Sequence, residues 1–205
     1  MVERTAGSQP LDPETPAGAR TPTRRTGPTL RGAALAGAWV VVATVLQLVR
    51  APDRPPWRAL WAEDGHVFLS QALDDPLGSL FRSHSGYLQL MGRVVGAVAA
   101  TVPLEDAAIA FAVVGSLLAS ILSVYVYFSS RSMLDSTWAR ALLAASMVFA
   151  SVTAFEVSAN GLNLHWYLLF ACFLALWSTD ESTPMLVADS VVVTLATLSG
   201  PLVLL

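Results

Sequence analysis

Long runs of apolar residues without a charged side chain are the feature that most constrains the fold of this chain. Residues 32–49 form one uncharged run and residues 107–130 form a second, longer one. About 20 apolar residues in a helix span the hydrocarbon core of a bilayer. Three further apolar stretches lie near residues 139–155, 161–179 and 185–205. The sequence therefore predicts an all-α, polytopic membrane protein with about five transmembrane helices.

The composition supports a membrane class. Hydrophobic residues make up 54% of the chain and charged residues 13%, whereas soluble domains carry about 25% charged residues. The charges crowd into residues 1–31, residues 50–82 and short connectors. The single cysteine, Cys172, lies in an apolar run, which excludes a disulfide within one chain and a cysteine-based metal cluster. No basic face with interleaved aromatic residues is present, so nucleic acid is not an expected partner.

Residues 1–31 have the composition of a disordered tail that precedes a transmembrane domain at 32–205. This tail is rich in Pro, Thr, Gly and Arg and has no apolar periodicity. Its basic residues are Arg4, Arg20, Arg24, Arg25 and Arg31. The positive-inside rule then predicts a multi-pass protein of the plasma membrane with a cytoplasmic N-terminus. A cleaved signal peptide is less favoured, because the tail is long for an n-region and residues 49–52 make a poor cleavage site.

Residues 88–103 are ambiguous, because this short apolar stretch carries Arg93 near its middle. An arginine at the centre of a membrane helix costs about 2.5–3.5 kcal/mol. If the stretch lies in the interface, the connector 131–140 falls on the cytoplasmic side, as the positive-inside rule favours. We therefore expect an interfacial or re-entrant helix at 88–103, with Arg93 snorkelling outward. It would belong to an extracytoplasmic loop at 51–106.

Two adjacent carboxylates, Glu63 and Asp64, stand just outside the first predicted span. A carboxylate at an apolar boundary tends to have a raised pKa and can serve as a base or a metal ligand. The alternative is a solvated acidic pair at a helix start, where the charge complements the helix dipole. His66 and His84 could add metal ligands, although no tight ligand motif such as H-x-x-x-H is present.

Other polar residues stand at helix mouths. Arg82 could bind a phosphate or meet lipid headgroups. Asn163 and His165 begin a predicted span, where they could bind a sugar or phosphate or hydrogen-bond a neighbouring helix. Asp189 is expected to reach cytoplasmic water from a helix start. The Gly200–Pro201 pair would break a spanning helix, which is tolerated only against protein or a wet cavity.

Short motifs carry a resemblance to a known superfamily. The matching elements are W-A-E-D-G at Trp61–Gly65, G-Y-L at Gly86–Leu88, Arg93, N-L-H-W at Asn163–Trp166, and the span from Ala107. This arrangement resembles the GT-C superfamily of polyprenyl-phosphate-dependent glycosyltransferases. It is also similar to bacterial membrane proteins that carry the three short motifs. The resemblance covers roughly residues 33–205.

The resemblance implies sugar transfer from a lipid-phosphate donor at the extracytoplasmic face of the cell envelope. Asp64 would act as the catalytic base or hold a divalent metal ion, with Glu63 beside it. The residues implied to bind substrate are His66, Arg82, Arg93, Asn163 and His165. Either arginine would steady the phosphate leaving group, since guanidinium binds phosphate through two parallel hydrogen bonds. A full member has about twice as many spans, so the chain would correspond to the N-terminal half.

Two other classes remain open at this stage. A non-catalytic assembly partner or truncated protein is favoured by the apolar sequence at Leu205, which also suggests the front part of a longer protein. A transporter subunit would use Asn163, His165 and the Gly200–Pro201 break as groups at a central site. No phosphate-cradling glycine loop is present, which disfavours a soluble nucleotide-sugar donor.

Overall fold

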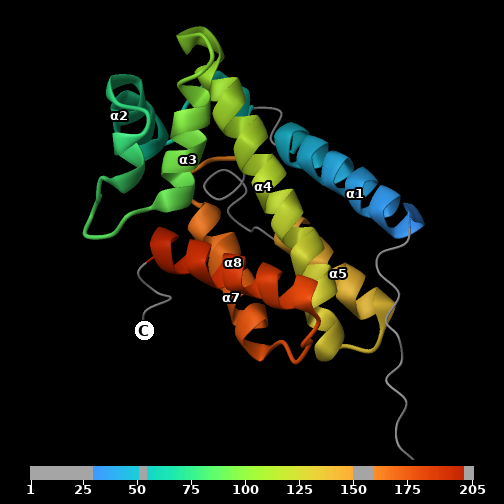
Figure 1. Cartoon of the computed structure of the whole chain (residues 1–205). Helices are drawn as coiled ribbons and strands as arrows, with labels where there is room; N and C mark the ends of the chain where they lie inside the picture. Colours follow the sequence, from blue (N-terminus) through green and yellow to red (C-terminus); the bar gives the residue numbers. More distant parts are fainter. Residues whose placement is uncertain (1–29, 51–54, 150–158, 201–205) are drawn as a thin grey trace, which may run out of the picture.

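The computed structural model describes residues 30–50, 55–149 and 159–200, and these residues form helices and no strand (Figure 1). The longer helices are α1 (Leu30–Val49), α2 (Ser70–Asp74), α3 (Leu90–Ala99), α4 (Ala107–Ser129), α5 (Thr137–Phe149), α7 (Leu164–Trp177) and α8 (Thr183–Ser199). The short helical turns are η1 (Pro56–Arg58), η2 (Asp64–Leu69), η3 (Gly78–Phe81), η4 (Leu104–Asp106) and η5 (Ser130–Ser132). The all-α prediction is confirmed for the described part of the chain.

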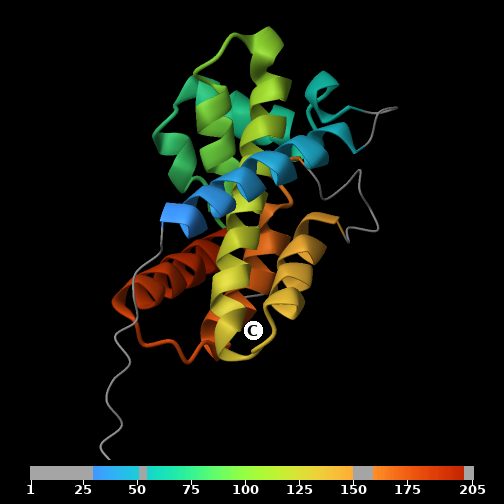
Figure 2. The same cartoon turned by 90° about the vertical axis from the view of Figure 1, so that its right-hand side faces the viewer.

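Helix α4 is the centre of the fold, and α1 lies across it (Figure 2). The indole Nε1 of Trp39 donates to Ser123 Oγ at 2.8 Å. Further along, Thr44 Oγ1 lies 3.2 Å from Ser120 Oγ, and Gln47 Nε2 donates to the same oxygen at 2.9 Å. Residue numbers rise along α1 as they fall along α4, so the two helices run antiparallel. Polar side chains thus set the register of an otherwise apolar helix pair.

Each of the five predicted spans contains a helix. Two helical stretches, Leu30–Val49 and Leu104–Ser132, are long and apolar enough to cross a membrane by length and composition. Helices α5, α7 and α8 are shorter apolar helices. Parts of the predicted spans, at 150–158 and 201–205, lie outside the described residues.

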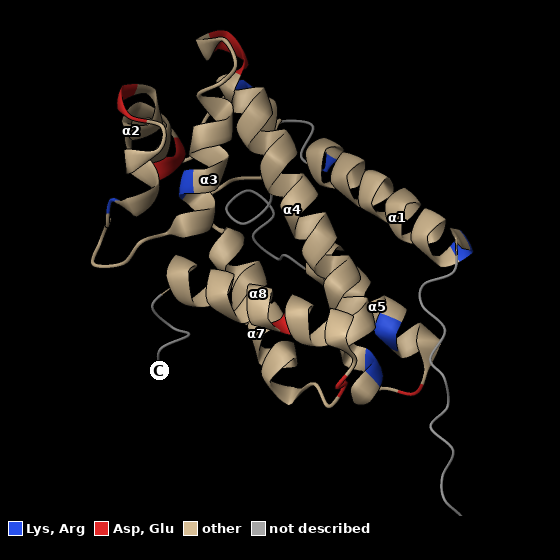
Figure 3. Cartoon of the chain, in the orientation of Figure 1, with Lys and Arg blue, Asp and Glu red and all other residues tan. Residues whose placement is uncertain are grey.

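The connectors between the helices gather at two ends of the bundle. At one end, which we call the Asp180 end, the connectors 130–136 and 178–182 meet: Arg131 Nε donates to Asp180 Oδ2 at 2.7 Å, and Nη2 binds the same oxygen. At the other, the Asp64 end, the segment 55–106 packs beside the N-terminal half of α4 and receives the connector 159–163. Charged residues lie mostly at these ends, with long uncharged stretches between them (Figure 3).

The prediction that Arg93 snorkels outward from an interfacial helix is wrong. Helix α3 is present within 88–103, but only 1% of Arg93 is exposed. An arginine in the first turns of a helix points back toward the N-terminus, and here its guanidinium finds acceptors. Nε donates to the Leu88 carbonyl at 2.7 Å, while Nη1 donates to Gln71 Oε1 at 2.9 Å and the Ser79 carbonyl at 2.8 Å. These hydrogen bonds offset the cost of burying the charge.

Two further expectations are corrected. Asp189 does not simply reach water, because Tyr125 on α4 donates its hydroxyl to Asp189 Oδ1 at 2.6 Å. This bond joins α8 to α4. Leu30 and Arg31, which were assigned to the disordered tail, are already part of α1. The rest of the predicted tail, residues 1–29, lies outside the described residues.

Candidate functional site

The W-A-E-D-G motif and the connector before α7 meet in the structure. Asp64 is buried, with 1% of its surface exposed. Its Oδ2 accepts the backbone N–H of Gly161 at 3.1 Å, and its Oδ1 accepts the N–H of Leu162 at 2.9 Å. One carboxylate therefore joins two segments that the sequence had identified separately, about 100 residues apart.

Local backbone geometry makes this joint. Ala62 has a positive φ of 39°, and the π-helical turn η2 begins two residues later at Asp64. A side-chain carbon added at Gly161 would lie 3.2 Å from Asp64 Oδ1 and 3.2 Å from Val95 Cβ. An alanine at 161 would therefore require the carboxylate or Val95 to shift by a few tenths of an ångström.

The surroundings of Asp64 are apolar, and no cationic side chain of the described residues forms an ion pair with it. Burial raises the pKa of its carboxyl to about 7, the hydrogen bonds from Gly161 and Leu162 act in the opposite direction, and the charge of Glu63 adds to the rise. A carboxyl that titrates near neutral pH is a frequent feature of functional sites, although structural groups also show it.

His165 follows one turn after the joint, at the start of α7. Its Nδ1 lies 2.7 Å from the carbonyl oxygen of Leu162. A carbonyl only accepts, so Nδ1 carries the hydrogen, and in the neutral imidazole Nε2 then has the lone pair. The ring is half-buried, and its centroid lies 4.8 Å from that of Trp166. A side-chain carbon at Gly200 would lie 3.6 Å from His165 Cβ, so the end of α8 forms one wall beside the histidine.

The remaining acidic and imidazole groups of the motif are more accessible. Glu63 is half-buried beside Asp64, and His66 is exposed, with its Nδ1 3.1 Å from the Ala62 carbonyl. Asn163 sits directly before α7, where its backbone N–H donates to Asn160 Oδ1 at 2.9 Å. The predicted polar residues of both motifs thus lie at the Asp64 end.

The two predicted phosphate ligands form a separate group. Arg82 is exposed, and its Nη2 lies 4.0 Å from Oδ2 of Asp75. Arg93 holds the loop between α2 and α3, and burial together with the charge of Arg82 lowers its pKa. Its Nη2 is buried without a hydrogen-bond partner among the described residues. The structure shows no contact between either guanidinium and Asp64.

Sequence reasoning missed the contact between α3 and the end of α8. The N–H of Met91 donates to Ser199 Oγ at 3.2 Å, and Gln89 before it is buried with a positive φ of 55°. The break predicted at Gly200–Pro201 was the only signal for this contact, since α8 ends at Ser199.

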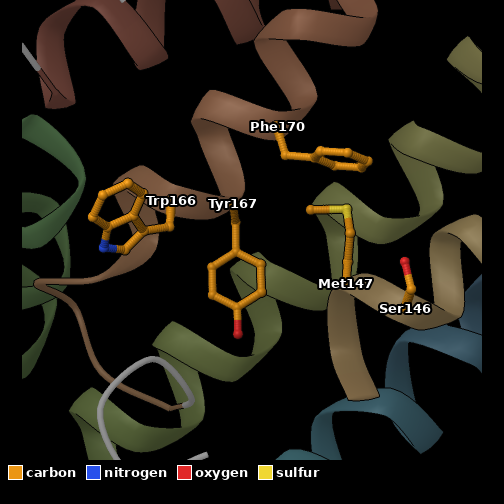
Figure 4. A pocket seen from close by; sticks show the side chains of 5 residues that line it. All are labelled: Ser146, Met147, Trp166, Tyr167 and Phe170. Atoms are coloured by element: carbon orange, nitrogen blue, oxygen red, sulfur yellow. The ribbon is translucent and has the colours of Figure 1, made fainter. Parts of the chain in front are cut away.

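A cavity of about 240 Å³ opens between α5 and α7. Its lining is mostly apolar and consists of Ser146, Met147, Trp166, Tyr167 and Phe170 (Figure 4). Phe170 and Met147 lie close together on one side, while Trp166 stands apart on the other. Trp166 is therefore shared between this cavity and the ring contact with His165.

The described residues contain no group of three His, Cys, Asp or Glu side chains that could hold a metal ion. A divalent ion at Asp64 therefore stays a prediction from the resemblance. In comparisons with known proteins, no protein family, curated protein or solved structure matches this chain.

Proposed function

We propose that the chain is a multi-pass protein of the plasma membrane, with a cytoplasmic N-terminus, and that it acts as a GT-C-like glycosyltransferase or as the N-terminal half of one. It would move a sugar from a polyprenyl-phosphate donor at the extracytoplasmic face. The observation that carries this proposal is the joint between Asp64 and residues 161–162, because it unites the two polar motifs on which the resemblance rests.

The exposure of α1 supports the membrane part of the proposal. Leu35 and Val41 are 72% and 63% exposed, and only 11% of the apolar window of α1 is buried. The core helix of a soluble protein would be mostly buried, and a large exposed apolar surface needs a partner. Lipid is the partner that fits a helix of 20 residues with this composition.

The two ends of the bundle support the proposed topology. The antiparallel pairing of α1 with α4 points the start of α1, with Arg31, away from the start of α4, and Arg131 and Asp180 lie beyond the end of α4. Arginines that flank apolar helices favour the cytoplasmic side, so the Asp180 end would be cytoplasmic. The Asp64 end, with the folded segment 55–106, would then be extracytoplasmic.

In this proposal the Asp64 end supplies acid–base chemistry and sugar contacts, from Glu63, Asp64, His66, Asn163 and His165. Arg82, which is exposed, would meet the lipid phosphate, and the buried Arg93 would hold the loop between α2 and α3 that carries Arg82. A guanidinium pairs well with the charge that develops on a phosphate leaving group.

Deletion of the gene in the native host tests the proposal, with cell-envelope glycans as the measurement. We expect a glycan to be lost, to return with the wild-type gene, and to stay absent with Asp64→Ala. Asp106→Asn, which changes an exposed carboxylate in the same segment, is the matched control and should restore the glycan. Unchanged glycans after deletion would exclude the transferase.

A non-catalytic assembly role has one observation in its favour. Both oxygens of Asp64 accept main-chain hydrogen bonds, as in a purely structural joint. In that case the glycan level should follow the amount of folded protein in the membrane across a set of Asp64 variants. A transferase predicts instead that some variant is present at normal amounts and still inactive.

A further inference from the structure

We propose that His165 is the general base of this site, and that Asp64 is a positioning residue that acts on His165 through Leu162. This inference rests on the proposed transferase function, and it assigns the proton transfer to a different residue from the one that the superfamily resemblance implies.

The backbone of Leu162 links the two side chains. Its N–H donates to Asp64 Oδ1 at 2.9 Å, and its carbonyl oxygen accepts from His165 Nδ1 at 2.7 Å. The N–H of Gly161 donates to the other oxygen of the carboxylate at 3.1 Å, so Asp64 binds two consecutive backbone N–H groups of the turn. Asp64 thereby fixes the position of the carbonyl that selects the tautomer of His165.

The exposure of the two groups decides which of them can reach a substrate. Asp64 is 1% exposed and both of its oxygens are engaged, so contact with a hydroxyl would require the turn to open. His165 is half-buried, and the hydrogen on Nδ1 leaves the lone pair of the neutral imidazole on Nε2. A general base must come within hydrogen-bond reach of the proton that it takes. Because His165 is half-buried, its contact with a substrate does not require the turn to open.

Space beside the imidazole supports this assignment. Gly200 brings only backbone to this wall, and a side chain there would begin 3.6 Å from His165 Cβ and 4.0 Å from Cδ2. Trp166 covers the ring from another side at 4.8 Å between centroids. The imidazole is therefore bordered by Trp166 on one side and by the backbone of Gly200 on another.

The acceptor hydroxyl gives its proton to Nε2 of His165, and its oxygen forms a bond to the anomeric carbon of the sugar. The bond from that carbon to the lipid phosphate breaks, and its electron pair stays on the phosphate oxygen. The imidazolium then releases the proton to water.

The first test measures the tautomer of His165 in the full chain, in detergent or bilayer discs, through ¹⁵N shifts of its imidazole. The chain has three histidines, so single His→Gln variants assign the signals. We expect the hydrogen on Nδ1 in the wild type and a mixture with the Nε2 form in Asp64→Asn, whose amide cannot accept both N–H groups. Asp106→Asn, the matched control in the same segment, should leave the tautomer unchanged. A wild-type His165 with its hydrogen on Nε2 would overturn the proposal without any variant.

The second test uses the deletion strain and its cell-envelope glycan. We expect His165→Gln to lower the glycan at least 100-fold at equal protein amount, which is within the usual range for a general base. Adding Asp64→Asn to His165→Gln should cause little further loss, because residues that act through one another are not additive. Full glycan with His165→Gln, together with loss in Asp64→Asn, would return the base to Asp64 and leave the transferase intact. Unchanged glycans after gene deletion would sink the transferase itself, whereas the tautomer measurement would still stand.

Discussion

Two buried carboxylates, one at each end of the bundle, each join two segments of the chain, but their electrostatic surroundings are opposite. Asp180 is 4% exposed and joins the connector after α7 to Arg131 beyond α4. Asp64 is 1% exposed and joins the segment after α1 to the connector before α7. Burial raises the pKa of Asp180, but the bonds from Arg131 and Ser182 outweigh it and hold the pKa at about 2. Asp64 has only neutral N–H donors, and its pKa is about 7.

The difference separates a fixed charge from a switchable one. Asp180 keeps its charge throughout the physiological range, because a guanidinium stabilises the ionised form. Asp64 gains or loses a proton near neutral pH, because burial is not compensated by an opposite charge. A permanently charged carboxylate such as Asp180 suits a structural contact. A carboxyl that titrates near neutral pH, such as Asp64, suits a site at which protons are transferred.

Removal of Arg131 should give the largest effect. Arg131→Ala leaves the Asp180 carboxylate buried without its cation, which we expect to cost about 3 kcal/mol of unfolding free energy. Chemical denaturation in detergent measures this loss. The double variant Arg131→Ala with Asp180→Asn should recover much of it, and no recovery would show that the charge is not the cause.

The pH dependence of the free energy of unfolding should distinguish the Asp64 end from the Asp180 end. Since the folded pKa of Asp64 is raised from 3.8 to about 7, folding favours the protonated form, and stability falls as pH rises through 7. Between pH 5 and pH 8 we expect a loss of about 2–3 kcal/mol from this group. Asp180 contributes in the opposite direction, and only below about pH 4.

Asp64→Asn is the control for that measurement. Without a titrating group at 64, the fall in stability between pH 5 and pH 8 should largely disappear. A wild-type protein that is equally stable at both pH values would contradict the electrostatic contrast between the two ends.

Substitution of Gly161 should have a smaller effect. A methyl group in Gly161→Ala would stand 3.2 Å from Asp64 Oδ1 and must displace the carboxylate or Val95. We expect a loss of about 1–2 kcal/mol, as for other overpacked positions. Gly37→Ala on α1, where nothing lies within 4 Å, is the control and should be neutral or slightly stabilising.

Glu63→Gln should cause the smallest change. The charge of Glu63 contributes to the raised pKa of Asp64, behind burial. Its removal should move the midpoint of the pH-dependent loss of stability slightly downward, with no change at the Asp180 end. A shift upward would mean that Glu63 acts on Asp64 by a different route.

The sequence was sufficient for local features and insufficient for contacts between distant residues. Uncharged runs predicted α1 and α4 to within a few residues, because periodicity and length are local properties. The raised pKa of Asp64 was anticipated from its position at an apolar boundary. Its bonds to residues 161 and 162 could not be, since the partners are 97 and 98 positions away and contribute only backbone. Backbone donors leave no signature in residue type.

Arg93 is a second residue whose surroundings the sequence could not predict. Charge and position predicted an outward-facing side chain, because an isolated guanidinium is costly to bury. Its acceptors include the main-chain carbonyls of Ser79 and Leu88, which any residue type could supply. Only the path of the loop after α2 reveals that the charge is accommodated.

The joint at Asp64 also imposes an order of events during synthesis. Ribosomes add about 5–20 residues per second, so Gly161, 97 positions later, is made roughly 5–20 s after Asp64. During that interval the segment after α1 has left the ribosome while the turn that receives its carboxylate does not yet exist. The nascent chain must therefore keep this segment from misfolding or proteolysis until α7 begins to emerge.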